Sequence, residues 1–234
     1  MNKETTIIII GTAHRLREPG KQAPDKSIKE CVYSREICKD IVAVLKSYGY
    51  KAEVDFEDLD LPKNMQSANY TQERNRELAM RVNYVNEICR QNGAGNVIYV
   101  SIHLDAAGSG AKWMSAGGWS CFTSPGKTKA DTLAECLYDA AERNLKHYAE
   151  LMKQGQLTGK YDKKQTPIRK DLTDGDRDKE ASYNVLTRTQ CPAVLTENLF
   201  QDNKADVEYL LSPEGRHVIT RIHVEGIINY IQKN

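Results

Sequence analysis

Four side chains of this 234-residue sequence belong to types that bind metals or move protons, and they occur beside apolar segments. His14 follows a run of four isoleucines, and His103 lies near the end of N-V-I-Y-V-S-I-H-L-D-A-A. Glu197 directly follows A-V-L-T, and Glu30 comes after a loop with proline and glycine. Two imidazoles and one carboxylate are typical ligands of a catalytic zinc with an open fourth position, and a second carboxylate can transfer protons. The four residues could supply both functions.

Each residue also has a simpler explanation when it is taken alone. His103 could be a hydrogen-bonded histidine at a strand end, His14 a loop residue and Glu30 a solvated acid of a first helical turn. The spacings are too long to have the specificity of a motif such as H-E-x-x-H. Glu197 is harder to explain in this way, because a carboxylate at the end of a buried strand is costly unless it is paired or bound.

The elements that must position these residues follow from the apolar patterns, which predict strands and helices in alternation. The predicted strands are Thr6–Ile10, Lys51–Phe56, Val97–Ile102, Gly117–Thr123, Ser182–Leu186 and Pro192–Glu197. The predicted helices are Ser27–Tyr48, Thr71–Gln91, Thr128–Gln154, Asn203–Leu211 and Pro213–Ile231. No repeat and no linker between two cores is present, so we expect one α/β domain over residues 1–234 with a mostly parallel sheet. In such sheets, sites form at the carboxyl ends of the strands.

Composition excludes several classes of protein. The net charge of +1 argues against binding of nucleic acid or of an anionic membrane by bulk charge. The six cysteines form no C-x-x-C pair, so a zinc–thiolate cluster is not predicted. No apolar run approaches the roughly 20 residues of a membrane span, and no signal peptide is recognised. We therefore expect a protein made in the cytoplasm or a trimmed mature form. A polar excursion is predicted at about residues 155–180, in which Lys160–Lys179 is a solvated loop or the wall of a groove.

Five segments, in chain order, resemble the zinc-dependent N-acetylmuramoyl-L-alanine amidases of the amidase-3 family. They are I-I-I-I-G-T-A-H, S-I-K-E, R-V-N-Y-V-N, S-I-H-L-D-A, and C-P-A-V-L-T-E-N-L-F followed by D-N-K-A-D. R-V-N-Y-V-N resembles the family's R-x-x-x-x-N, and S-I-H-L-D-A resembles S-x-H-x-N-A. Each segment is a weak signal alone, but together they span nearly the whole chain in the order of the family.

The resemblance implies that His14, Glu30 and His103 bind zinc and that Glu197 is the catalytic glutamate. It also implies a phosphorylase/hydrolase-like fold, in which a mixed sheet is flanked by helices. The expected reaction is hydrolysis of the amide bond between N-acetylmuramic acid and L-alanine in peptidoglycan, at the bacterial cell wall. A phage lysin and a periplasmic enzyme would both fit this reaction. The oligomeric state is left open.

The sequence departs from the family pattern beside the site. The usual G-H-G is A-H-R here, Asp105 replaces a frequent asparagine, and Asn198 stands where a small or apolar residue is common. The stretch Lys127–Lys179 is longer than its counterpart in the family. These changes concern the recognition of substrate more than the metal.

Two rival functions remain open at this stage. A zinc peptidase or carboxypeptidase on a similar scaffold would need a cation for the terminal carboxylate, for which Arg169 or Arg188 could serve. A non-catalytic wall-binding module would have no need for all four site residues.

No function is expected for the histidines outside the site, His147, His217 and His223, whose spacing offers no chelate. Trp119 is predicted to lie in the core. Trp113, among glycines at the mouth of the crevice, could contact a sugar ring.

Overall fold

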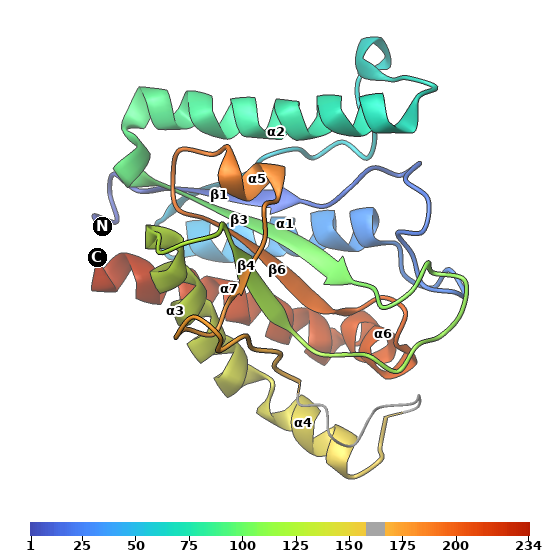
Figure 1. The fold of residues 1–234 in the computed structure, drawn as a ribbon. Coiled ribbons are helices and arrows are strands. Elements are labelled where there is room, and N and C mark those ends of the chain that lie inside the picture. The colour runs from blue at the N-terminus through green and yellow to red at the C-terminus, as the bar shows by residue number, and fades with distance from the viewer. Residues whose placement is uncertain (158–166) are drawn as a thin grey trace.

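A six-stranded sheet forms the centre of the computed structural model, which describes residues 1–157 and 167–234. The strands are β1 (Ile7–Thr12), β2 (Lys51–Val54), β3 (Val97–Asp105), β4 (Ser120–Thr123), β5 (Lys179–Glu180) and β6 (Ala193–Phe200). Their order is β2-β1-β3-β6-β4-β5, and only the β4–β6 pair is antiparallel. The prediction of a single α/β domain with a mixed, mostly parallel sheet is therefore confirmed (Figure 1).

Helices cover both faces of the sheet (Figure 1). One face packs against α1 (Glu30–Ser47), α3 (Lys129–Asn144) and α7 (Pro213–Lys233) in the larger apolar core. The other face packs against α2 (Tyr70–Asn92) and the short α5 (Asn184–Thr187) in a second core. The remaining helices are α4 (Lys146–Lys153), α6 (Lys204–Leu211) and the 3₁₀ turns η1 (Lys63–Met65) and η2 (Ala94–Asn96). None of the helices in the described residues is long and apolar enough to cross a membrane.

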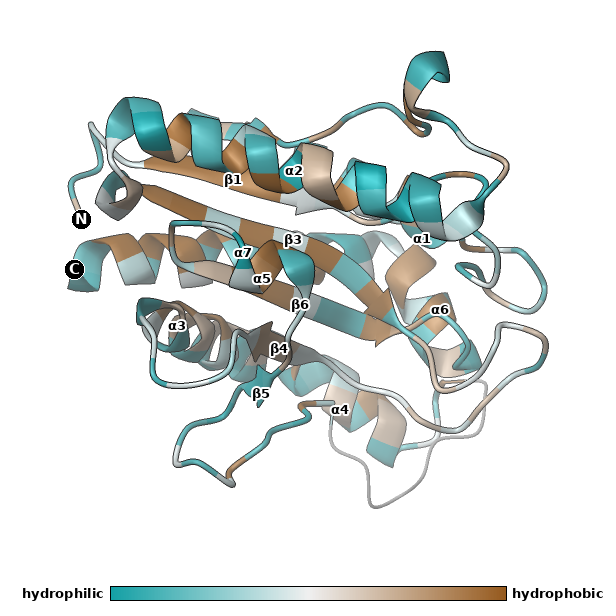
Figure 2. Cartoon of the chain, turned by 45° about the horizontal axis from the view of Figure 1, so that its top comes forward, coloured by the Kyte–Doolittle hydropathy of each residue, from teal (hydrophilic) through white to brown (hydrophobic). Residues whose placement is uncertain are grey.

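The isoleucine run of β1 explains why the sheet has an apolar core on each face. Successive side chains of a strand point to opposite faces. Ile8 and Ile10 accordingly join the larger core, whereas Ile9 joins the core under α2. Figure 2 shows the apolar colour concentrated along β1 and β3. At Gly11 a Cβ atom would lie 2.2 Å from the Tyr99 hydroxyl, so only glycine lets this side chain reach Asp55, 2.9 Å away.

Two predicted elements are wrong. Residues 182–186 were expected to form a strand, but helix α5 (Asn184–Thr187) begins there and buries Val185 and Leu186. A short apolar run does not distinguish a strand from a helix, and packing against α2 decides the outcome here. The helix predicted over Thr128–Gln154 is interrupted at the buried Leu145. The amide of Asn144 donates to the Ala140 carbonyl and competes with the regular helical hydrogen bond.

The predicted excursion at residues 155–180 is only partly described. Residues 158–166 lie outside the described residues, whereas the segment from residue 167 onward is attached to the fold. Ile168 forms a bridge with Trp119, and Arg177 contacts the acidic side chains of α3 at 2.6–3.1 Å. Strand β5 then pairs with β4. Only Lys179 and Glu180 of this stretch join the sheet, whereas residues 172–175 are exposed.

Candidate metal centre and active site

The candidate side chains lie where neighbouring parallel strands end. His14 follows β1 by two residues, His103 lies near the end of β3, and Glu197 lies in β6. Because β1, β3 and β6 are adjacent and parallel, their carboxyl ends open at one edge of the sheet. The register pairs His103 directly with Glu197, so the two side chains project from the same face.

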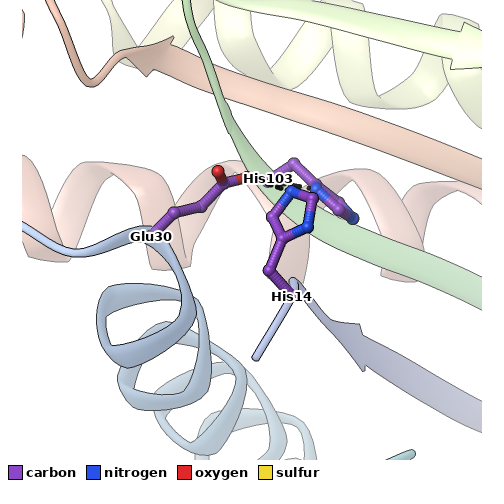
Figure 3. Close-up of side chains that lie close together, drawn as sticks. All are labelled: His14, Glu30 and His103. Atoms are coloured by element: carbon purple, nitrogen blue, oxygen red, sulfur yellow. Dashed lines mark hydrogen bonds and ion pairs between the residues drawn. The ribbon is translucent and has the colours of Figure 1, made fainter. Parts of the chain in front are cut away.

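Glu30 is the first residue of α1, and its carboxylate approaches the two neighbouring imidazole rings from one side (Figure 3). It is fully buried, and its Oε1 lies 3.3 Å from His14 Nε2 and 3.1 Å from His103 Nδ1. The Leu104 backbone N–H donates to the same oxygen at 3.1 Å, and the Gln201 amide donates to Oε2 at 3.2 Å. A carboxylate at a helix N-terminus is further stabilised by the helix dipole. Glu30 is thus held rigidly, with one oxygen directed at both imidazoles.

The loop that carries His14 is held in a strained conformation. His14 has φ of 48°, in the left-handed region that few residues other than glycine adopt. The guanidinium of Arg35 donates to the carbonyls of Ala13 and His14 at 2.9 and 3.1 Å. Backbone strain of this kind is found at functional sites, where the surrounding structure enforces it. The contacts with Arg35 provide that enforcement.

The three candidate ligands are close enough together to hold one metal ion. Each of His14, Glu30 and His103 offers one ligand atom, and these three atoms lie within 4.8 Å of one another. The imidazole rings meet edge to face, with centroids 5.1 Å apart. Two histidine nitrogens and one carboxylate oxygen suit a catalytic zinc with an open fourth position. The donor set and its geometry therefore fit zinc.

The shifts in pKa within the cluster show that the buried carboxylate of Glu30 stabilises a positive charge beside it. Burial alone would lower the pKa of His14, but the charge of Glu30 and a hydrogen bond with Glu18 raise it to about 9. Burial alone would raise the pKa of Glu30, but the two histidines hold it well below its usual value. Burial lowers the pKa of His103. Without a metal, Glu30 is an anion that is balanced by a proton on His14, and a metal ion can replace that positive charge.

Glu197 differs electrostatically from Glu30. Its side chain is half-buried, and its Oε2 is covered and has no hydrogen-bond partner among the described residues. Burial, followed by repulsion from Asp105 and Glu30, raises the pKa of Glu197 well above its usual value. Two carboxylates with opposite shifts in pKa are the pattern expected of acid–base chemistry. Glu197 can therefore hold a proton at a pH at which Glu30 remains ionised.

A pocket of about 340 Å³ contains the two histidines and Glu197. It lies between α2 and the α5 segment, and residues of β1, β3 and β6 form its floor. Its other lining residues are Thr12, Glu18, Lys21, Tyr70, Arg74, Glu77, Leu78, Arg81, Ser101, Ser182, Tyr183, Asn184, Val185 and Leu195. Most of these residues are polar or charged, and a concave pocket in which titratable groups with shifted pKa values converge is a candidate substrate site.

Several residues that support the site were not identified from the sequence. Ser101 Oγ lies 3.1 Å from His103 Nε2, the nitrogen that does not face Glu30. Asn198, noted only as a departure from the family pattern, is fully buried, donates to the His103 carbonyl at 3.0 Å and accepts from Trp119 Nε1 at 2.8 Å. The pattern S-I-H could have suggested Ser101. No sequence signal identifies the contacts of Asn198.

The remaining predicted residues lie outside the pocket. His147 and His217 are exposed, and the buried His223 contacts Thr196 Oγ1 and the Ile219 carbonyl. Trp119 is in the core, as predicted. The three further residues that the sequence suggested as substrate contacts do not line the pocket; these are Trp113, Arg169 and Arg188. Trp113 packs against the larger core, and Arg169 donates to the Gly117 carbonyl.

Comparisons with known proteins agree with this geometry. Residues 8–229 match the sequence family described as N-acetylmuramoyl-L-alanine amidase. The CwlD amidase of Clostridioides difficile, solved in complex with the GerS lipoprotein, is 20% identical with a TM-score of 0.69, covering 98% of this chain and 100% of that chain. The amidase Ami1 of Mycobacterium smegmatis is 17% identical with a TM-score of 0.67, covering 100% of both chains.

The catalytic domain of the CD27L endolysin, which targets Clostridioides difficile, is 18% identical with a TM-score of 0.58, covering 96% of this chain and 97% of that chain. No match was found among curated protein sequences. Identities this low establish a shared fold, and the family match covers most of the chain.

Proposed function

The chain belongs to the N-acetylmuramoyl-L-alanine amidase family, and on that basis we propose that it uses a zinc ion held by His14, Glu30 and His103, with Glu197 as the general base. As a member of this family, the protein hydrolyses the amide bond between N-acetylmuramic acid and L-alanine in peptidoglycan. The proposal concerns the metal and the roles of the four residues.

One observation supports the proposal above all others. The ligand atoms of His14, Glu30 and His103 lie within 4.8 Å of one another, and Glu197 is paired with His103 on the adjacent strand. This arrangement supports a role for Glu197 as the proton acceptor, because Glu197 neighbours His103 but is not part of the cluster.

The chemistry divides between the metal and the protein. Zinc, when bound, polarises the scissile carbonyl and lowers the pKa of water to about 7. Glu197 accepts a proton from the attacking water and delivers it to the amine of the departing L-alanine. The raised pKa of Glu197 suits this exchange, because a general base must also release its proton to the leaving group near neutral pH. Glu30 remains ionised throughout.

The same proposal covers the extent of the domain and its setting. The family match over residues 8–229 and the single sheet support one catalytic domain over residues 1–234. A peptidoglycan substrate supports action at the bacterial cell wall, in the periplasm or outside the cell. A phage lysin and a periplasmic enzyme both suit such a role.

The rival functions receive less support. The two cations predicted for a carboxypeptidase, Arg169 and Arg188, do not line the pocket. The pocket does contain Lys21, Arg74 and Arg81, of which Arg81 is already paired with Asp55 and Glu77. A wall-binding module would gain nothing from a rigidly held carboxylate in contact with two histidines.

Digestion of purified peptidoglycan, followed by mass spectrometry of the fragments, tests the reaction. We expect free stem peptides with a new N-terminal alanine. New reducing ends of sugars, or cuts within the stem peptide, would contradict the assignment. Elemental analysis of the same protein should find about one zinc per chain, because the three ligands define a single site.

A further inference from the structure

We propose that Glu18 is a positioning residue that orients His14 toward the metal and strengthens it as a ligand. This inference rests on the proposed function, since Glu18 can act in this way only if His14 binds zinc. It concerns a residue of the loop that departs from the family pattern, and it follows from the ion-pair contacts that both nitrogens of the His14 imidazole make with carboxylates.

The two nitrogens of His14 face opposite partners. Nε2 lies 3.3 Å from Glu30 Oε1, on the side of the ligand cluster, and Nδ1 lies 3.0 Å from Glu18 Oε2. The side chain of Glu18 is 4% exposed, so this is not a solvent-screened surface pair. A carboxylate at Nδ1 fixes the tautomer in which Nε2 carries the lone pair, and this lone pair is what a metal requires.

Glu18 is itself held by one neighbour on α2 and one in its own loop. The Tyr70 hydroxyl, at the start of α2, donates to Glu18 Oε1 at 2.5 Å. Arg15 Nη2 lies 3.6 Å from Oε2, and the Glu18 backbone N–H donates to the Arg15 carbonyl at 3.1 Å. The carboxylate therefore has little freedom to leave His14.

The two histidines of the cluster differ in the nature of their second partner. His103 turns its other nitrogen to Ser101 Oγ at 3.1 Å, a neutral group, whereas His14 faces an anion. An anionic partner makes the ligand nitrogen more basic, and loss of such a partner typically weakens metal affinity 10- to 100-fold. We therefore expect zinc binding to depend more strongly on Glu18 than on Ser101.

A purely structural role for Glu18 is the alternative explanation. Arg15 is almost fully buried and also pairs with Glu73 at 3.3 Å and Glu77 at 3.2 Å, both on α2. Glu18 could simply help to neutralise Arg15 and close the loop. Glu73 provides the matched control, because it pairs with the same guanidinium and has no recorded contact with His14.

The test is zinc affinity, measured by competition with a chelator on the intact 234-residue chain. Glu18→Ala should weaken binding 10- to 100-fold. Glu18→Gln should weaken it less, since the amide oxygen still accepts from Nδ1 but carries no charge. Glu73→Gln should leave the affinity near that of the parent. The absorption spectrum of the cobalt-substituted protein should shift in the two Glu18 variants and stay unchanged in Glu73→Gln.

Two outcomes would overturn the inference. One is a Glu18→Ala protein that binds zinc as tightly as the parent, and the other is equal weakening by Glu73→Gln. If Glu18→Ala does not fold, Glu18→Gln, which keeps the shape of the side chain, takes its place. Its zinc affinity is then compared with that of the parent and with that of Glu73→Gln. A parent protein that binds no zinc would instead refute the proposed function.

Discussion

Replacement of Glu197 by glutamine should reduce activity while leaving the fold intact or more stable. The variant keeps the shape of the side chain but cannot accept the proton of water. Loss of general-base catalysis typically costs 10²- to 10⁴-fold in rate, or about 3–5 kcal/mol of activation free energy. Substrate binding should change little, because the loss falls on the transition state. Turnover of peptidoglycan fragments and their KM measure both effects.

The stability of the Glu197→Gln variant follows from the raised pKa of the parent side chain. Because the folded state holds this proton more tightly than the unfolded state does, ionisation destabilises the fold as pH rises above the unfolded value. One such group changes the free energy of unfolding by at most about 1.4 kcal/mol per pH unit. We therefore compare melting temperatures after zinc has been removed by a chelator. The variant should have nearly the same melting temperature as the parent at pH 5 and a higher one at pH 8.

The control for this variant is Glu57→Gln, which changes an exposed carboxylate away from the pocket. It should retain activity and show no pH-dependent gain in melting temperature. Our reasoning would be refuted by a zinc-loaded, normally folded Glu197→Gln protein that cleaves peptidoglycan at the parent rate. A variant with a lower melting temperature and full activity per folded molecule would mean that Glu197 is a structural acid.

Three further variants test neighbouring parts of the site. His103→Ala should keep the fold and lose most of the zinc, and full zinc occupancy by elemental analysis would exclude His103 as a ligand. Asp105→Asn removes a negative charge that raises the pKa of Glu197, so the acidic limb of the pH–activity profile should move to lower pH; an unchanged or higher limb would contradict this. Asn198→Ala removes the hydrogen-bond partner that Asn198 provides to Trp119 Nε1 and to the His103 carbonyl. Urea unfolding should show that the free energy of unfolding falls by about 2–4 kcal/mol, and a change near zero would mean that these hydrogen bonds contribute little.

The sequence predicted the fold well because its apolar patterns are local. The isoleucine run of β1 and the segment ending at His103 are short, β-branched runs typical of buried strands, and both form strands. The antiparallel position of β4 and the pairing of β5 depend on contacts between distant segments, which no local pattern encodes. Helix α5 was mistaken for a strand because its conformation is set by packing against α2.

The candidate site was predicted less completely than the fold. The sequence could identify the three candidate ligands because each lies in a segment that resembles a family motif. The structure brings the ligand atoms of His14, Glu30 and His103 together. The contact between Glu18 and His14 depends on the φ of 48° at His14 and on side-chain orientation. Such features are decided by tertiary packing, so the sequence alone could not predict them.

The zinc site can be tested directly by an anomalous difference map, measured at the zinc absorption edge from crystals of the 234-residue chain. We expect a single strong peak in contact with His14, Glu30 and His103, with Glu197 beside the metal but not bound to it. A peak at another position, or one in which Glu197 is a ligand and His14 or Glu30 is not, would show that the proposed ligand set is wrong.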